Sequence, residues 1–182
     1  MNPSNDEGKN RPAASRRPVI NMAEARLEAF GPPAEAGDGV AKFGAMIARL
    51  GPAVGAEKLG CTLVVLEPGK RAWPYHLHHR NEEMYVILSG TGTLRLGDGE
   101  HALCAGDVAT CPPGPGTAHQ VINTGDEELR YLVISTMEGP EIAEYPDSGK
   151  VGALAGTPGQ RPYHLFHLTT RDAAKDYWDG EA

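Results

Sequence analysis

Short apolar segments, each closed by a turn signal, follow one another at near-regular spacing from residue 59 to residue 136. A segment of four to eight apolar and β-branched residues between such signals is typical of a strand. The predicted strands are 61–67, 83–89, 93–96, 101–103, 108–111, 118–123 and 129–136. Many short strands without intervening helices predict an all-β sandwich or barrel rather than alternating strands and helices. The composition agrees, because 23 glycines and 15 prolines among 182 residues supply many tight turns.

Segments on either side of this central region differ from it in composition and pattern. The expected units are a disordered arm (1–17), an N-terminal extension packed on the barrel (18–58), the barrel (59–136) and a C-terminal extension (137–182). The N-terminal extension has a weak helical pattern over 22–30, and 41–50 is either a short helix or an irregular strand. We expect the chain to loosen after residue 137, with one more strand-like piece at 163–168.

Both extensions carry apolar side chains that one small barrel does not fully cover. These residues are Phe30, Phe43, Ile47, Leu154, Phe166 and Trp178. Because burying apolar surface stabilises association, we expect a homodimer.

Charge and cysteine content exclude several classes of protein. The chain has 17 Lys and Arg against 24 Asp and Glu, a formal charge of −7, whereas a nucleic-acid partner requires a basic face. Its three cysteines show no paired spacing, so a disulfide framework is not expected. No apolar run is long enough to span a bilayer, and the first residues lack the apolar region of a secretory signal. We therefore expect a cytoplasmic protein that binds neither nucleic acid nor membrane.

Three histidines and one glutamate stand out in and beside the predicted strands: His76, His78, Glu83 and His119. Side chains alternate between the two faces of a strand, so His76 and His78 point the same way, roughly 7 Å apart at their Cα atoms. Glu83 begins the next strand, and His119 lies at the start of a later one. If these strands are neighbours in one barrel, three imidazoles and a carboxylate converge in its interior.

This set of side chains suits a divalent transition ion. Neutral imidazole and carboxylate together bind Fe, Mn, Co, Ni, Cu or Zn, and three His with one Glu leave two positions open on an octahedral ion. A catalytic metal needs open positions, whereas a purely structural one does not. We expect the cofactor to be iron, zinc, manganese or nickel, with no preference among them from the residue types alone.

Two neighbouring residues compete for the same roles. Glu82 could replace Glu83 as the carboxylate ligand, but strand parity places it on the face opposite to Tyr85. His79 fails the same test, so it is expected at the rim or on the surface.

Four more residues are candidates for the pocket around the ion. Trp73, Tyr75 and Tyr85 flank the histidines and the glutamate, either as core or as the aromatic wall of a substrate pocket. Asn123 shares a strand face with His119 and suits hydrogen bonding to the backbone or to a ligand residue better than metal ligation.

The stretch from Gly69 to Gly90 resembles the first cupin motif, with H-x-H, a four-residue gap to Glu and six further residues to a glycine. Gly106 to Asn123 resembles the second, with Gly, Pro, a further Gly, His and Asn. Two spacings are longer than in the family: the gap after Gly69 and the loop before His119. Neither removes a ligand.

The resemblance implies a double-stranded β-helix, also called a jelly-roll barrel, with a short irregular or helical N-terminal arm and a C-terminal extension. It places the metal in the mouth of the barrel, on His76, His78, Glu83 and His119. The phrases NEEMYVILSGTGTLRLGD and EYPDSGKVG resemble a group of small single-domain bacterial cupins that are sometimes labelled sugar-phosphate-isomerase-like.

Three functions are compatible with this resemblance. The first is a metal-dependent enzyme acting on a small molecule by oxygenase, lyase or decarboxylase chemistry, with no catalytic residue yet assigned. The second is a sugar or sugar-phosphate isomerase, which predicts basic residues at the mouth to hold phosphate. The candidates for that role are Lys70, Arg71, Arg80 and Arg95. The third is a non-enzymatic binding or sensing module.

Overall fold

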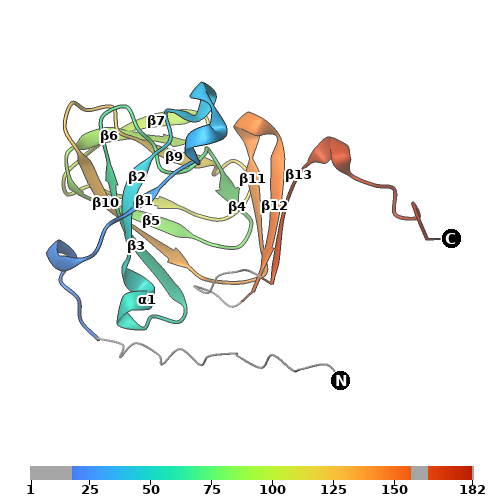
Figure 1. The fold of residues 1–182 in the computed structure, drawn as a ribbon, viewed down its shortest axis with the longest axis horizontal. Helices are drawn as coiled ribbons and strands as arrows, with labels where there is room; N and C mark the ends of the chain where they lie inside the picture. The colour runs from blue at the N-terminus through green and yellow to red at the C-terminus, as the bar shows by residue number, and fades with distance from the viewer. Residues whose placement is uncertain (1–17, 157–163, 182) are drawn as a thin grey trace, which may run out of the picture.

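Three antiparallel sheets surround the main apolar core in a computed structural model that describes residues 18–156 and 164–181 (Figure 1). The six-stranded sheet has the order β1 (Glu28–Phe30), β2 (Ala45–Arg49), β3 (Leu59–Leu66), β10 (Leu129–Thr136), β5 (Glu83–Ser89) and β8 (Val108–Cys111). The three-stranded sheet has the order β7 (Gly99–Cys104), β6 (Thr91–Leu96) and β9 (His119–Ile122). The four-stranded sheet has the order β13 (Leu165–Thr170), β12 (Lys150–Ala155), β11 (Glu141–Tyr145) and β4 (Leu77–His78).

Helical structure in the described residues is confined to short pieces. They are α1 (Leu50–Val54) and the 3₁₀ turns Met22–Glu24, Ala34–Ala36, Asp38–Val40, Pro146–Ser148 and Arg171–Ala173. Within the same residues, no helix is long and apolar enough to cross a membrane. The prediction of an all-β fold is confirmed.

Alternation along β5 shows how the sequence builds the barrel wall. Tyr85 and Ile87 are buried, whereas Met84 before them and Leu88 after them are exposed. β10 lies between β3 and β5 in register, so its own inward residues, such as Tyr131, meet this buried face. Burying each such side chain contributes about 1.5–3 kcal/mol, which fixes the register because a one-residue slip would expose the whole set.

The turn after β5 requires a glycine. Gly90 has φ +81°, a conformation that side chains with a Cβ rarely adopt. A Cβ at this position would also overlap the carbonyl oxygen of Glu128 and lie 2.9 Å from Leu129 Cα. The β5–β6 turn therefore packs directly on the backbone that enters β10.

The extensions differ from the sequence expectations. The helix expected over 22–30 is absent: a single 3₁₀ turn is followed by β1, which pairs with β2 at the edge of the six-stranded sheet. Of the two alternatives for 41–50, the strand is present as β2. The loosening expected after residue 137 is wrong, because β11 and β12 form a hairpin there and β13 extends it. The expectation for 1–17 lies outside the described residues.

Candidate metal centre

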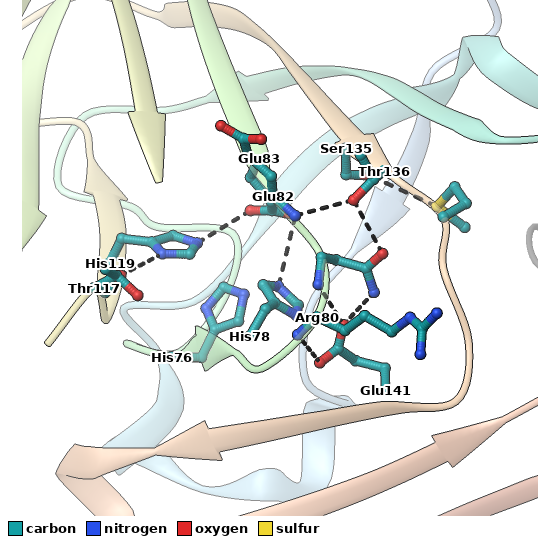
Figure 2. A network of polar contacts seen from close by, with 12 residues as sticks. His76, His78, Arg80, Glu82, Glu83, Thr117, His119, Ser135, Thr136 and Glu141 are labelled. Atoms are coloured by element: carbon teal, nitrogen blue, oxygen red, sulfur yellow. Dashed lines mark hydrogen bonds and ion pairs between the residues drawn. The ribbon is translucent and has the colours of Figure 1, made fainter. Parts of the chain in front are cut away.

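The four residues singled out from the sequence meet in the barrel. One ligand atom from each of His76, His78, Glu83 and His119 lies within 4.8 Å of the others (Figure 2). Each sheet contributes: β4 carries His78, β5 begins at Glu83 and β9 begins at His119. His76 precedes β4 and is tied to His119 by two backbone hydrogen bonds of 3.2 and 2.7 Å. Strand pairing therefore brings segments that are distant in the sequence together around the four candidate ligands.

In two of the histidines, His76 and His119, the ring nitrogen Nδ1 is hydrogen-bonded to the backbone. His76 Nδ1 donates to the carbonyl oxygen of Pro74 at 2.8 Å, and His119 Nδ1 donates to that of Thr117 at 2.9 Å. A carbonyl can only accept, so each Nδ1 carries a proton. In a neutral ring the lone pair then belongs to Nε2, and the Nε2 of His119 faces Glu83. Backbone bonds of this kind fix ring orientation in metal sites.

His78 differs from the other two because neither ring nitrogen is satisfied. Both nitrogens are buried and have no hydrogen-bond partner among the described residues. The nearest carboxylate oxygens are Glu83 Oε1, 3.7 Å from Nε2, and Glu141 Oε2, 3.8 Å from Nδ1. Leaving a buried polar group without a partner costs about 1–3 kcal/mol. A metal ion bound at this ring would relieve that cost, so the residues present fit such a group.

Glu83 is oriented by two donors on one oxygen. Tyr85 Oη donates to Glu83 Oε2 at 2.6 Å, and His119 Nε2 lies 3.1 Å from the same atom. The other oxygen, Oε1, faces His78. Burial raises the pKa of Tyr85 well above its usual value, and the negative charge of Glu83 raises it further, so its hydroxyl remains a donor.

The charge state of the metal-free site follows from these contacts. Both nitrogens of His119 face acceptors, so the ring is satisfied only when doubly protonated. Burial disfavours that charge, but contacts with Cys111 and Glu83 outweigh it and raise the pKa of His119 to about 10.

The pKa values of the other two titrating residues, His76 and Glu83, are lowered. Burial, followed by the charge of His119, lowers the pKa of His76 to about 4. Burial acts to raise the pKa of Glu83, but the His119 hydrogen bond and the charges of the imidazoles lower it to about 2. Near neutral pH the site therefore holds a carboxylate, a neutral His76 and a proton on His119.

A cavity of about 500 Å³ opens beside His76, His78 and Glu83. This volume falls within the range of small-molecule sites. Its walls are mainly apolar and include Phe30, Trp73, Val133, Tyr145, Leu154 and Phe166. The cavity is therefore wide enough for a small organic molecule that reaches the cluster.

Of the four pocket candidates, only Trp73 lines this cavity, where it packs against Phe30 with ring centroids 5.2 Å apart. Tyr75 donates to the carbonyl of Gly97 at 2.7 Å, away from the cluster. Tyr85 acts through Glu83, as described above. Asn123 is fully buried, and among the described residues its side chain bonds backbone groups only.

The competing residues lie outside the cluster. The His79 ring is bonded to Glu144 Oε1 at 2.8 Å and is partly exposed. Glu82 accepts from the hydroxyl of Thr110 at 3.2 Å on the outer side of the sheet. Strand parity therefore placed both residues as the structure does.

Comparisons with known proteins agree with this geometry. A family model described as the Cupin domain matches residues 62–135. A solved structure described as a sugar phosphate isomerase from the cupin superfamily, from Silicibacter pomeroyi, is 28% identical, with a TM-score of 0.70 over 89% of this chain and 98% of that one. The chain therefore contains a cupin domain, at residues 62–135. The predicted double-stranded β-helix is thereby confirmed.

Two curated proteins match this chain over shorter stretches. Auxin-binding protein 1 of Arabidopsis thaliana is 29% identical over 134 residues, 69% of this chain and 58% of that protein. Protein MJ1618 of Methanocaldococcus jannaschii is 34% identical over 73 residues, 38% of this chain and 57% of that protein. The chain thus spans less than two thirds of the length of each.

Residues beyond the matched cupin segment also reach the site, although no sequence motif indicates a role for them. Glu141 approaches His78, and Tyr145 stacks on His76 with ring centroids 6.1 Å apart. Lys150 lines the cavity. All three lie on the β11–β12 hairpin, where no metal-ligand spacing marks them. The one available signal was the phrase EYPDSGKVG, which carries Tyr145 and Lys150.

Proposed function

We propose that this cupin binds one divalent transition ion through His76, His78, Glu83 and His119. The observation that carries the proposal is the buried convergence of three imidazoles and a carboxylate around His78, whose ring nitrogens have no other partner in the described chain. The partly buried carboxylate of Glu83 is oriented by Tyr85, and two of the rings are oriented by backbone carbonyls.

We further propose that the protein is a metal-dependent enzyme acting on a small molecule by oxygenase, lyase or decarboxylase chemistry. When bound, the ion would supply Lewis-acid polarisation of a substrate oxygen, with two coordination positions left open. The protein supplies the rest: a cavity of about 500 Å³ whose apolar walls, including Trp73 and Val133, exclude water from the substrate.

Sugar-phosphate isomerase is the second candidate, favoured by the description of the Silicibacter pomeroyi protein. It predicts a cluster of cations at the cavity to hold phosphate. Arg80 and Arg95, two of the expected cations, pair instead with Glu138 and Asp147. Within the described chain, Lys150 is the one lysine or arginine that lines the cavity. The charge of the cavity thus favours the first candidate.

The third candidate is a small-molecule binding protein without turnover. The name of Auxin-binding protein 1 favours it, since that relative is named for the ligand it binds. A cavity with a metal serves binding and catalysis equally, so turnover of a candidate substrate separates the two.

A cytoplasmic homodimer remains part of the proposal. The support is a set of exposed apolar side chains near the C-terminus: Leu165, Leu168, Tyr177 and Trp178. Light scattering at micromolar concentration tests it, and the mass of one chain would refute it.

Elemental analysis of protein purified without added metal tests the metal proposal. We expect close to one transition ion per chain. Iron would favour oxygen chemistry, whereas zinc, manganese or nickel would favour lyase or isomerase chemistry. A chain that neither retains nor takes up any of these ions would refute the proposal.

A further inference from the structure

The loop between the two ligand-bearing strands, residues 79–82, is held by a carboxylate from the C-terminal part of the chain. Glu141 Oε1 accepts the backbone N–H of His79 at 2.9 Å and that of Arg80 at 3.2 Å. Glu141 Oε2 accepts the backbone N–H of Asn81 at 2.9 Å and also its side-chain amide. Successive backbone N–H groups aimed at one point form a concave site for an anion. Here the anion is a side chain of the same protein.

The same carboxylate faces one of the candidate ligands. Glu141 Oε2 lies 3.8 Å from His78 Nδ1, while Glu83 Oε1 lies 3.7 Å from His78 Nε2 (Figure 2). A metal-bound histidine ordinarily donates its other ring N–H to a carboxylate, a carbonyl or water. Backbone carbonyls fill this role for His76 and His119. Glu141 is the group placed to fill it for His78.

Strand pairing explains how a residue so far along the sequence reaches the site. β11 pairs with β4, with Ala143 opposite His78. Glu141 lies two residues before Ala143 on the same strand, so both side chains project from the same face, and Glu141 is level with the loop that follows His78. The segment matched by the family model ends at residue 135, before this strand begins.

We propose that Glu141 is a positioning residue of the metal centre. It fixes the 79–82 loop, and thereby the distance and orientation between His78 at one end and Glu83 at the other. Glu141 is not itself one of the four clustered ligands. The inference rests on the proposed metal site and extends it beyond the cupin motifs to the C-terminal hairpin.

A matched pair of variants tests this role with Co²⁺ as the probe. Glu141→Gln preserves the size of the side chain but replaces an accepting oxygen by an amide that donates toward backbone N–H groups. Loss of such a supporting group lowers metal affinity by about 10- to 100-fold, and the visible spectrum of bound Co²⁺ should change with the ligand geometry. The control is Glu144→Gln on the same strand. Among the described contacts, the Glu144 side chain bonds the His79 ring and Arg171 and does not bond the loop backbone, so affinity and spectrum should stay as in the wild type.

Equal Co²⁺ affinity and an unchanged spectrum in Glu141→Gln would overturn the proposal. If that variant does not fold, hydrogen exchange of the wild-type protein with and without Zn²⁺ tests the proposal. Zn²⁺ should slow hydrogen exchange of the backbone amides of 79–81 more than that of amides in β7, because loop and ligands are held as one unit. Unchanged exchange at 79–81 would overturn the proposal as well. A wild-type chain that binds neither ion refutes the proposed metal function itself, which is a separate outcome.

Discussion

Asn123 links three backbone segments, and its replacement by alanine should destabilise the barrel. Its side-chain amide donates to the carbonyls of Leu66 and Glu127, at 2.8 Å each, and its side-chain oxygen accepts the N–H of Gly125 at 3.0 Å. The residue is 0% exposed, so water does not replace these bonds freely. Three bonds at about 1 kcal/mol net, and more where a buried partner is left unsatisfied, predict a loss of about 3–5 kcal/mol for Asn123→Ala.

The assay is equilibrium urea denaturation, with the midpoint and slope fitted for each variant. Because the bonds are structural and lie away from the metal cluster, Asn123→Ala should keep close to one bound ion per chain. The control is Thr124→Ala, one residue along the chain. Its hydroxyl bonds only that of Thr93 among the described contacts, in an exposed position, and should cost less than about 1 kcal/mol.

Two results would refute this reasoning. One is a loss below about 1 kcal/mol for Asn123→Ala, since three buried bonds could not then be contributing as estimated. The other is an equal loss for Thr124→Ala, which would mean that the turn as a whole, and not the buried amide, sets the stability.

Further predictions concern the glycine turn and the protonation of the site. Gly90→Ala should cost more than about 4 kcal/mol because its Cβ would overlap the backbone, whereas Gly69→Ala, with φ +76° and open space, should cost about 1–2 kcal/mol. Equal midpoints in denaturation would contradict this. Since the pKa of His119 is raised to about 10, metal binding at pH 8 must displace its proton. Calorimetric Zn²⁺ titrations in buffers of different ionisation enthalpy should show about one proton released per ion, with affinity rising with pH up to that pKa. Binding without proton release would mean that His119 is not a ligand.

The central strands could be predicted because each carries its own signal. β5 begins at Glu83 and ends at Ser89, as its apolar alternation and following glycine indicate. The helix expected over 22–30 was wrong because tertiary packing outweighs a weak local pattern: Phe30 lies in a strand, against Trp73.

The candidate ligands could be predicted because strand parity and spacing act within short stretches. Parity separates His78 from His79, and parity together with the six-residue run to Gly90 separates Glu83 from Glu82. The role of Glu141 could not be predicted in this way, because it depends on β11 pairing with β4 across more than 60 residues of sequence. Pairing between strands that are distant in the sequence produces no local sequence pattern around the residue that it brings to the site.

Metal content of three proteins purified side by side tests the central claim most directly: the wild type, His78→Ala and His79→Ala. His78 belongs to the buried cluster, whereas the His79 ring is bonded to Glu144 outside it. We predict close to one transition ion per chain in the wild type and in His79→Ala, and an empty site in His78→Ala. If His79→Ala loses the ion and His78→Ala retains it, the face assignment is reversed, and the metal centre described here is contradicted.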